Sequence, residues 1–134
     1  RVVTIFLGQL LRGKPLTVIG DGRQTRAFTY VDDAVRATVQ AGLRPEAVGQ
    51  VINVGSEEEV SIAELAELMV RISGSPSAIE YVPQEAVYGP GYEDIRRRVP
   101  STGRMRELLG VAAEIPIEEG LRRTIEWFRQ EWTA

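Results

Sequence analysis

The chain has 134 residues, enough for one domain with a hydrophobic core, and its composition is that of an ordinary globular protein. It contains no cysteine and no histidine, which excludes disulfides, Cys/His zinc sites, histidine-based acid–base catalysis and Ser-His-Asp triads. A net charge of −3 gives no reason to expect nucleic acid or an anionic membrane surface as partner. We see no signal peptide or membrane-length apolar run, and expect a cytoplasmic protein.

The N-terminal residues read as a helix over 1–12 with one buried face. Apolar residues recur there at helical spacing, and Gly13 and Pro15 end the pattern. The chain begins with Arg1, without an initiator methionine, and we expect Arg1 to lie inside this helix. We therefore expect it to be part of a longer protein.

The stretch that follows predicts a strand over 16–19, a tight turn at Gly20-Asp21-Gly22 and a second strand over 27–31. Asp32 or Asp33 is expected to cap a helix that carries an apolar stripe and runs to about residue 43. Residues 50–54 form a short apolar run between glycines, which predicts another strand. The order strand, helix, strand suggests a crossover unit.

The rest of the chain predicts an α/β pattern without a domain boundary. The three glutamates at 57–59 are expected in a solvated turn, and residues 83–95 are expected to be irregular. Further predicted elements are a helix begun by a Ser61–Glu64 capping box and ended at Gly74, a strand at 79–82, a helix at 102–109 capped by Ser101, and a helix from Ile117 to the C-terminus.

Arg26 is the strongest candidate for a binding residue. It follows the predicted turn, where a guanidinium can point into a cleft beside the strand ends. Arginine suits a diphosphate because its planar group donates two parallel hydrogen bonds. The alternative is a surface ion pair with Asp21 or Asp33, which contributes little to stability.

Residues 20–33 resemble the Gly-Asp-Gly-x-Gln-x-Arg-x-Phe-x-Tyr-Val-x-Asp signature of extended short-chain dehydrogenases that act on nucleotide sugars. These are NAD-dependent epimerases, dehydratases and decarboxylases. Asn53-Val54-Gly55, the Ser61–Leu68 helix and Glu118-Glu119-Gly120-Leu121-Arg122 also match, so the resemblance covers nearly the whole chain. The chain departs from the family at Ser101, where aspartate is usual, and at 111–113, where Trp-x-Pro is usual.

The resemblance implies an α/β fold: the C-terminal substrate-binding part of such an enzyme, with short strands and about five helices. Residues 1–134 would form a single nucleotide-sugar-binding domain, incomplete without an N-terminal Rossmann domain that this chain lacks.

The resemblance also implies binding residues. Arg26 would contact the diphosphate. Residues 88–100 resemble a Tyr-Glu-Asp-x-x-Arg-Arg-x-Pro-Asp segment that lies over the nucleotide, so that Asp94 would serve the ribose and Arg97 or Arg98 the phosphates. The alternative is that at least one of the three consecutive arginines Arg96, Arg97 and Arg98 faces solvent. Thr17 and Ile19 are expected to flank the base of the nucleotide, and Phe28 to line the site. The alternative for all three is ordinary packing within strands.

The catalytic and cofactor-binding residues of the family are expected elsewhere. Its base is a tyrosine whose pKa is lowered by a lysine four residues later, and none of the four tyrosines here has that lysine. Gly20-Asp21-Gly22 does not begin a dinucleotide fingerprint, because Thr25 stands at the third glycine position and strand-like residues follow. We therefore expect NAD to be bound by the absent N-terminal half, and this chain alone to be inactive.

The expected function is binding of the nucleotide-diphosphate part of a sugar nucleotide, first of all for a UDP-glucose 4-epimerase. The alternatives are a UDP-glucuronate decarboxylase, a dTDP-glucose 4,6-dehydratase, or a non-catalytic nucleotide-sugar-binding module. The expected partners are a UDP-sugar or another nucleotide sugar and, in the full-length protein, a second copy of the chain. No nucleic acid, membrane or metal partner is expected.

Overall fold

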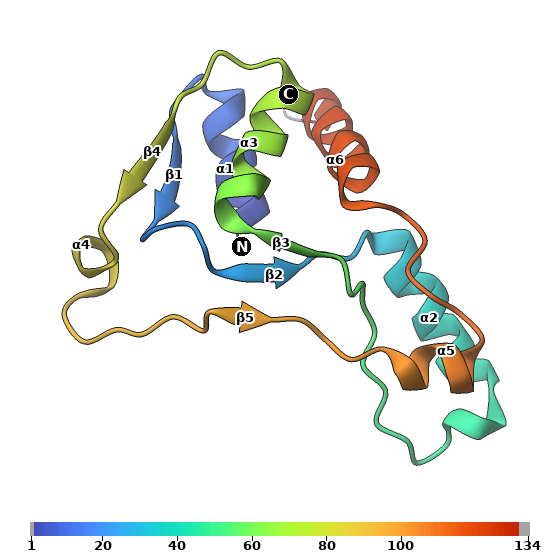
Figure 1. Ribbon diagram of the computed structural model, residues 1–134. Coiled ribbons are helices and arrows are strands. Elements are labelled where there is room, and N and C mark those ends of the chain that lie inside the picture. Colours follow the sequence, from blue (N-terminus) through green and yellow to red (C-terminus); the bar gives the residue numbers. More distant parts are fainter. Residues whose placement is uncertain (1, 132–134) are drawn as a thin grey trace.

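The computed structural model describes residues 2–131 and has an α/β architecture (Figure 1). One group of elements consists of the helices α1, α3 and α6 with two strands beside them, and a second group contains α2 and α5. The helices in the described part are α1 (Val2–Leu11), α2 (Val31–Leu43), a 3-10 turn (Pro45–Ala47), α3 (Ile62–Ser73), α4 (Gln84–Tyr88), α5 (Gly103–Leu109) and α6 (Ile117–Glu131). The strands are β1 (Leu16–Ile19), β2 (Thr25–Ala27), β3 (Glu59–Ser61), β4 (Ile79–Val82) and β5 (Arg97–Arg98).

The main core lies where α1, α3 and α6 pack against one another and against β1. Phe6, Leu16, Leu65 and Met69 are 0% exposed there. The apolar spacing of the three helices therefore predicted their buried faces correctly. The described part of the chain has six α-helices rather than about five, because α4 forms inside the segment expected to be irregular.

The start and end of α3 follow the predicted local signals. Ser61 accepts a hydrogen bond from the Glu64 amide, and the Glu64 carboxylate accepts one from the Ser61 amide. This exchange satisfies two amides that have no partner within the helix. It also lowers the pKa of Glu64, because these donors favour the ionised carboxylate. Gly74 ends the helix in the left-handed conformation, with φ at 63°.

Two small sheets replace the predicted strand–turn–strand unit. β1 pairs in parallel with β4, whereas β2 lies between antiparallel β3 and parallel β5. Gly20 and Gly22 both have positive φ and turn the chain out of the first sheet. A Cβ at Gly22 would lie 2.9 Å from the side chains of Val18 and Ala63, so a glycine is needed for this close approach.

The segment from β2 to β3 differs from the prediction. β2 ends at Ala27, and Tyr30 is the N-cap of α2, so the expected Asp cap is wrong; Asp32 and Asp33 lie in the first turn instead. Residues 50–54 have no strand partner within the described residues. The next strand, β3, is antiparallel to β2, so these elements do not form a crossover unit.

The first turn of α5 also differs in detail. Thr102, rather than Ser101, is its N-cap, and it makes no side-chain cap hydrogen bond. Gly110 ends this helix in the left-handed conformation, as its position after the apolar pattern predicts.

Helix α2 forms as predicted, but its apolar residues point away from the protein. Four of them lie one turn apart along one face, and we call them the α2 stripe: Val31, Val35, Val39 and Leu43, whose exposures are 60%, 54%, 51% and 70%. The opposite face is buried through the small residue Ala37, which packs with Met105 and Leu109 of α5. The apolar spacing therefore predicted the helix and its stripe correctly, and the structure shows that the stripe is exposed.

No helix within residues 2–131 combines the length and the apolar character that spanning a membrane requires.

Candidate functional site

Arg26 is anchored in the middle of β2 by four contacts. Its Nη2 donates to both carboxylate oxygens of Asp94, at 3.0 and 3.1 Å. Its Nη1 donates to the carbonyl oxygens of Thr25 and Ile95, at 2.7 Å each. The side chains of Arg26 and Asp94 are only 17% and 30% exposed. Arg26 therefore forms an ion pair with Asp94, and not with Asp21 or Asp33 as the alternative proposed.

The pairing of β2 with β5 brings these two residues together. Arg26 stands opposite Arg98 in the parallel register, and the Thr25 amide donates to the Arg96 carbonyl. The segment before β5 must therefore run alongside β2. The same segment is also bonded to α4, because Gln84 Nε2 donates to the Tyr92 carbonyl at 2.7 Å.

A cavity of about 540 Å³ lies beside the Arg26–Asp94 pair. Its lining residues are Gly20, Asp21, Gln24, Gln84, Tyr92, Glu93, Asp94 and Arg96. Arg96 approaches Asp21 at 3.9 Å, so the wall carries charges of both signs. Carboxylates can accept hydrogen bonds from ribose hydroxyls, and guanidinium groups can bind phosphate oxygens.

Only Asp94 of the predicted site residues lines this cavity directly, and Arg26 reaches it through Asp94. Arg96, Gln84 and Tyr92 line the cavity but are not among the predicted site residues. Arg96 belongs to the arginine run 96–98, from which the prediction names Arg97 and Arg98 instead. Gln84 and Tyr92 carried no signal by themselves, because their position depends on α4 and the loop after it.

The other predicted residues have structural contacts of their own. Arg97 pairs with Glu59 on β3, at 2.9 Å between Nη2 and the carboxylate. Glu59 also accepts from the Thr25 hydroxyl, and this bond first and Arg97 second lower the pKa of the Glu59 carboxyl. Arg98 is exposed.

Thr17, Ile19 and Phe28 are likewise placed by packing. The Thr17 amide donates to the side-chain oxygen of Gln9, whose amide nitrogen donates back to the Thr17 hydroxyl. Ile19 is half-buried in β1, and Phe28 packs against the main core. The cavity is therefore lined by Asp94 and Arg96, with Arg26 behind Asp94, whereas Thr17, Ile19 and Phe28 do not line it.

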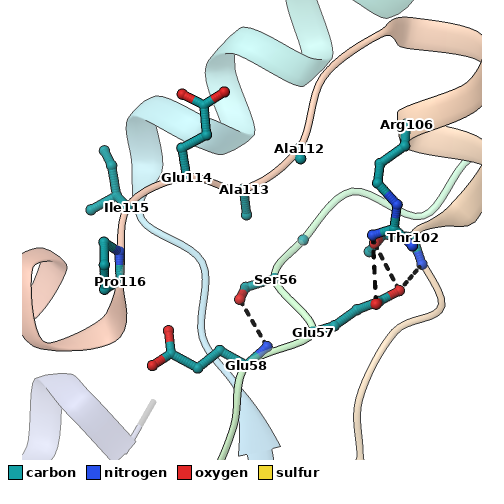
Figure 2. Close-up of a pocket in the computed structure, with 11 residues that line it drawn as sticks. Ser56, Glu57, Glu58, Thr102, Arg106, Ala112, Ala113, Glu114, Ile115 and Pro116 are labelled. Atoms are coloured by element: carbon teal, nitrogen blue, oxygen red, sulfur yellow. Dashed lines mark hydrogen bonds and ion pairs between the residues drawn. The ribbon is translucent and has the colours of Figure 1, made fainter.

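A second cavity, of about 430 Å³, lies between residues 55–58, α5 and the loop before α6 (Figure 2). Glu57 accepts from the amide and the hydroxyl of Thr102, at 2.8 Å each, and Arg106 lies 3.5 Å from it. These contacts lower the pKa of Glu57, the amide of Thr102 most. Glu58 accepts from the Ile117 amide.

Acidic side chains connect the segments around this cavity. Glu57 contacts the N-cap of α5, and Glu58 contacts the first residue of α6. Asp33, which is 5% exposed, accepts from the amides of Glu114 and Ile115 in the loop before α6. These contacts explain the second cavity better than ligand binding does.

The glutamates at 57–59 are exposed to solvent, as predicted. They do not form a turn, because Glu59 begins β3 and each of the three also contacts a distant segment of the chain.

Residues 2–131 contain no group of three or more acidic side chains placed to hold a metal ion.

Residues 1–55 match the profile of a family described as the NAD dependent epimerase/dehydratase family. The chain is 43% identical over 129 residues to a UDP-N-acetyl-alpha-D-glucosaminuronate decarboxylase of Bacillus cytotoxicus. This match covers 96% of the chain and 40% of the relative. The chain thus spans about 40% of the length of this relative.

Solved structures share the fold. A UDP-glucose 4-epimerase of Thermotoga maritima, solved with UDP-glucose, superposes with a TM-score of 0.86 at 32% identity, over 98% of this chain and 40% of that one. A UDP-glucuronic acid 4-epimerase of Bacillus cereus, in complex with UDP-glucuronic acid and NAD, gives 0.84 at 30% identity over the same shares. The chain belongs to the NAD dependent epimerase/dehydratase family of extended short-chain dehydrogenases.

Proposed function

We propose that this chain is the nucleotide-sugar-binding part of an NAD-dependent epimerase, dehydratase or decarboxylase, and that residues 1–134 correspond to its C-terminal domain. The observation that carries the proposal is a half-buried arginine, Arg26, beside a charged cavity of about 540 Å³. Two solved relatives that share the fold contain a UDP-sugar, which supports the same ligand class here.

In this proposal the site binds and orients the nucleotide. Arg26 and Arg96 would hold the diphosphate through charge-assisted hydrogen bonds, and Asp94 would accept from a ribose hydroxyl. Bound NAD would supply transient oxidation at a sugar carbon in the family's reactions. The chain's own share is to bind the nucleotide, because it lacks the Tyr-x-x-x-Lys pair and would be inactive alone.

UDP-glucose 4-epimerase remains our first choice of activity. UDP-glucuronate decarboxylase and dTDP-glucose 4,6-dehydratase are the alternatives, because the residues that separate these reactions are expected outside the chain. A homodimer of the complete polypeptide, NAD binding by its N-terminal half and a cytoplasmic location stay predictions.

A calorimetric titration with UDP, dTDP, GDP and NAD tests the proposal. We expect the chain to bind UDP or dTDP and not NAD, because the phosphate-binding arginines are present and the dinucleotide fingerprint is not. The same titration on the complete natural polypeptide should add NAD binding. If neither protein binds a nucleoside diphosphate, the proposal is wrong and a non-catalytic interaction module is favoured.

We further propose that the α2 stripe docks against the dinucleotide-binding domain of the complete polypeptide. Two further exposed valines, Val48 and Val51, follow α2 in the chain and are 79% and 80% exposed. A large exposed apolar surface is typical of an interface. Residues 50–54, whose strand partner is not found within residues 2–131, include Val51. The matched relative is long enough to supply such a domain, since the chain spans 40% of it.

The isolated chain should consequently self-associate and bind an apolar dye. Replacing Val35 and Val39 together with glutamate should abolish both properties without unfolding the chain, since both side chains are more than half exposed. Sedimentation velocity and dye fluorescence measure this, with Val87→Glu on α4, 46% exposed, as the control. A clean monomer of the unmodified chain without dye binding would contradict the proposal.

A further inference from the structure

We propose that Asp94 is an internal competitor for the diphosphate site: its carboxylate occupies Arg26 when the site is empty, and the incoming diphosphate displaces it. This inference rests on the proposed function, since it concerns how that same site is controlled. It is motivated by the pairing of a half-buried arginine with a carboxylate that comes from a loop 68 residues away in sequence.

Asp94 occupies one end of the Arg26 guanidinium. Both of its carboxylate oxygens contact Nη2 and share the N–H group that points toward them, whereas Nη1 donates to the carbonyls of Thr25 and Ile95. A phosphate that approaches this end of the guanidinium meets the Asp94 carboxylate, which carries the same sign of charge. The diphosphate therefore competes with Asp94 for Nη2.

Asp94 is the acceptor that is able to leave. The carbonyls of Thr25 and Ile95 are backbone groups, whereas the Asp94 carboxylate belongs to a side chain and can be withdrawn by rotation about side-chain bonds. The Asp94 side chain is 30% exposed and lines the cavity, so the freed carboxylate can be solvated there.

The exchange also explains how one residue can serve two roles. Before binding, Asp94 compensates the charge of a guanidinium that is only 17% exposed, which avoids an unpaired cation in a poorly solvated position. After displacement its carboxylate remains at the cavity wall, where it can accept from a ribose hydroxyl. Arg96, also in that wall, would add a second cation for the diphosphate.

Inorganic pyrophosphate is the probe that separates these roles, because it has phosphates and no ribose. On the complete natural polypeptide, Asp94→Asn should tighten pyrophosphate binding by about five- to tenfold, where tenfold corresponds to about 1.4 kcal/mol. The neutral amide fills the same space but no longer holds Arg26 as an anion. Calorimetry gives the dissociation constants.

Glu93→Gln is the matched control. Glu93 lines the same cavity and also carries one negative charge, but Asp94 is the carboxylate that contacts Arg26. Removing the charge of Glu93 should tighten pyrophosphate binding by about twofold at most, as expected for a solvent-screened charge. In an Arg26→Ala background the effect of Asp94→Asn should vanish, because the competition requires the arginine.

Three outcomes would overturn the competitor role. The first is weaker pyrophosphate binding by Asp94→Asn, which would show that Asp94 positions Arg26. The second is an equal effect of Asp94→Asn and Glu93→Gln, and the third is no pyrophosphate binding by either the unmodified protein or Asp94→Asn. If Arg26→Ala weakens UDP binding while Asp94→Asn fails to tighten pyrophosphate binding, only the competitor role fails. If Arg26→Ala leaves UDP binding unchanged, the proposed site fails with it.

Discussion

Replacing Arg26 with alanine in the complete natural polypeptide should weaken binding of UDP-sugar by about 1.5–3 kcal/mol, roughly 10- to 150-fold in the dissociation constant. This is the range for hydrogen bonds to a charged group. The low exposure of Arg26, 17%, favours the upper part, because water screens the interaction less there. Calorimetry or fluorescence titration with UDP and with a UDP-sugar measures the change.

Two further variants show whether charge or geometry matters. Arg26→Lys should recover only part of the affinity, because an ammonium cannot donate two parallel hydrogen bonds. Arg71→Ala removes an arginine that is 66% exposed on α3 and pairs with Glu118, so it should leave binding unchanged. An unchanged dissociation constant for Arg26→Ala would remove Arg26 from the site.

The second large effect is expected in the core. Phe6→Ala should lower the free energy of unfolding by about 3–5 kcal/mol, the range for removing a buried aromatic side chain. Phe6 is 0% exposed and belongs to the cluster that joins α1 with α3, α6 and β1. Because small domains are stable by only about 5–15 kcal/mol in total, this variant should lose a large part of its stability.

The neighbouring residue of the same helix is the control. Ile5 lies beside Phe6 in α1 and is 52% exposed, so Ile5→Ala removes an apolar side chain without opening a cavity in the core. It should cost less than about 1 kcal/mol in the isolated chain. Chemical denaturation followed by circular dichroism measures both variants. If Phe6→Ala and Ile5→Ala lowered the free energy of unfolding by similar amounts, the assignment of Phe6 to the core would be wrong.

The sequence by itself determined the elements whose signals are local. The period of apolar residues predicted α1, α3 and α6, and the Ser61 capping box and Gly74 predicted the two ends of α3. Such signals act within one or two turns of chain, so they can be read without knowing what lies opposite. The choice of Arg26 as a binding residue also used only its own neighbourhood, the turn residues before it and the signature around it, and it stays a prediction.

Tertiary structure alone decided which segments meet. Local spacing shows that α2 has an apolar face, but only packing shows that Ala37 is buried and the α2 stripe is exposed. The same limit applies to residues 50–54, whose apolar run predicts a strand but not a partner. The pairing of Arg26 with Asp94 depends on the register of β2 and β5, which are joined by a long connection. A residue's own type and spacing cannot specify its long-range partner, because that choice depends on how every intervening element packs.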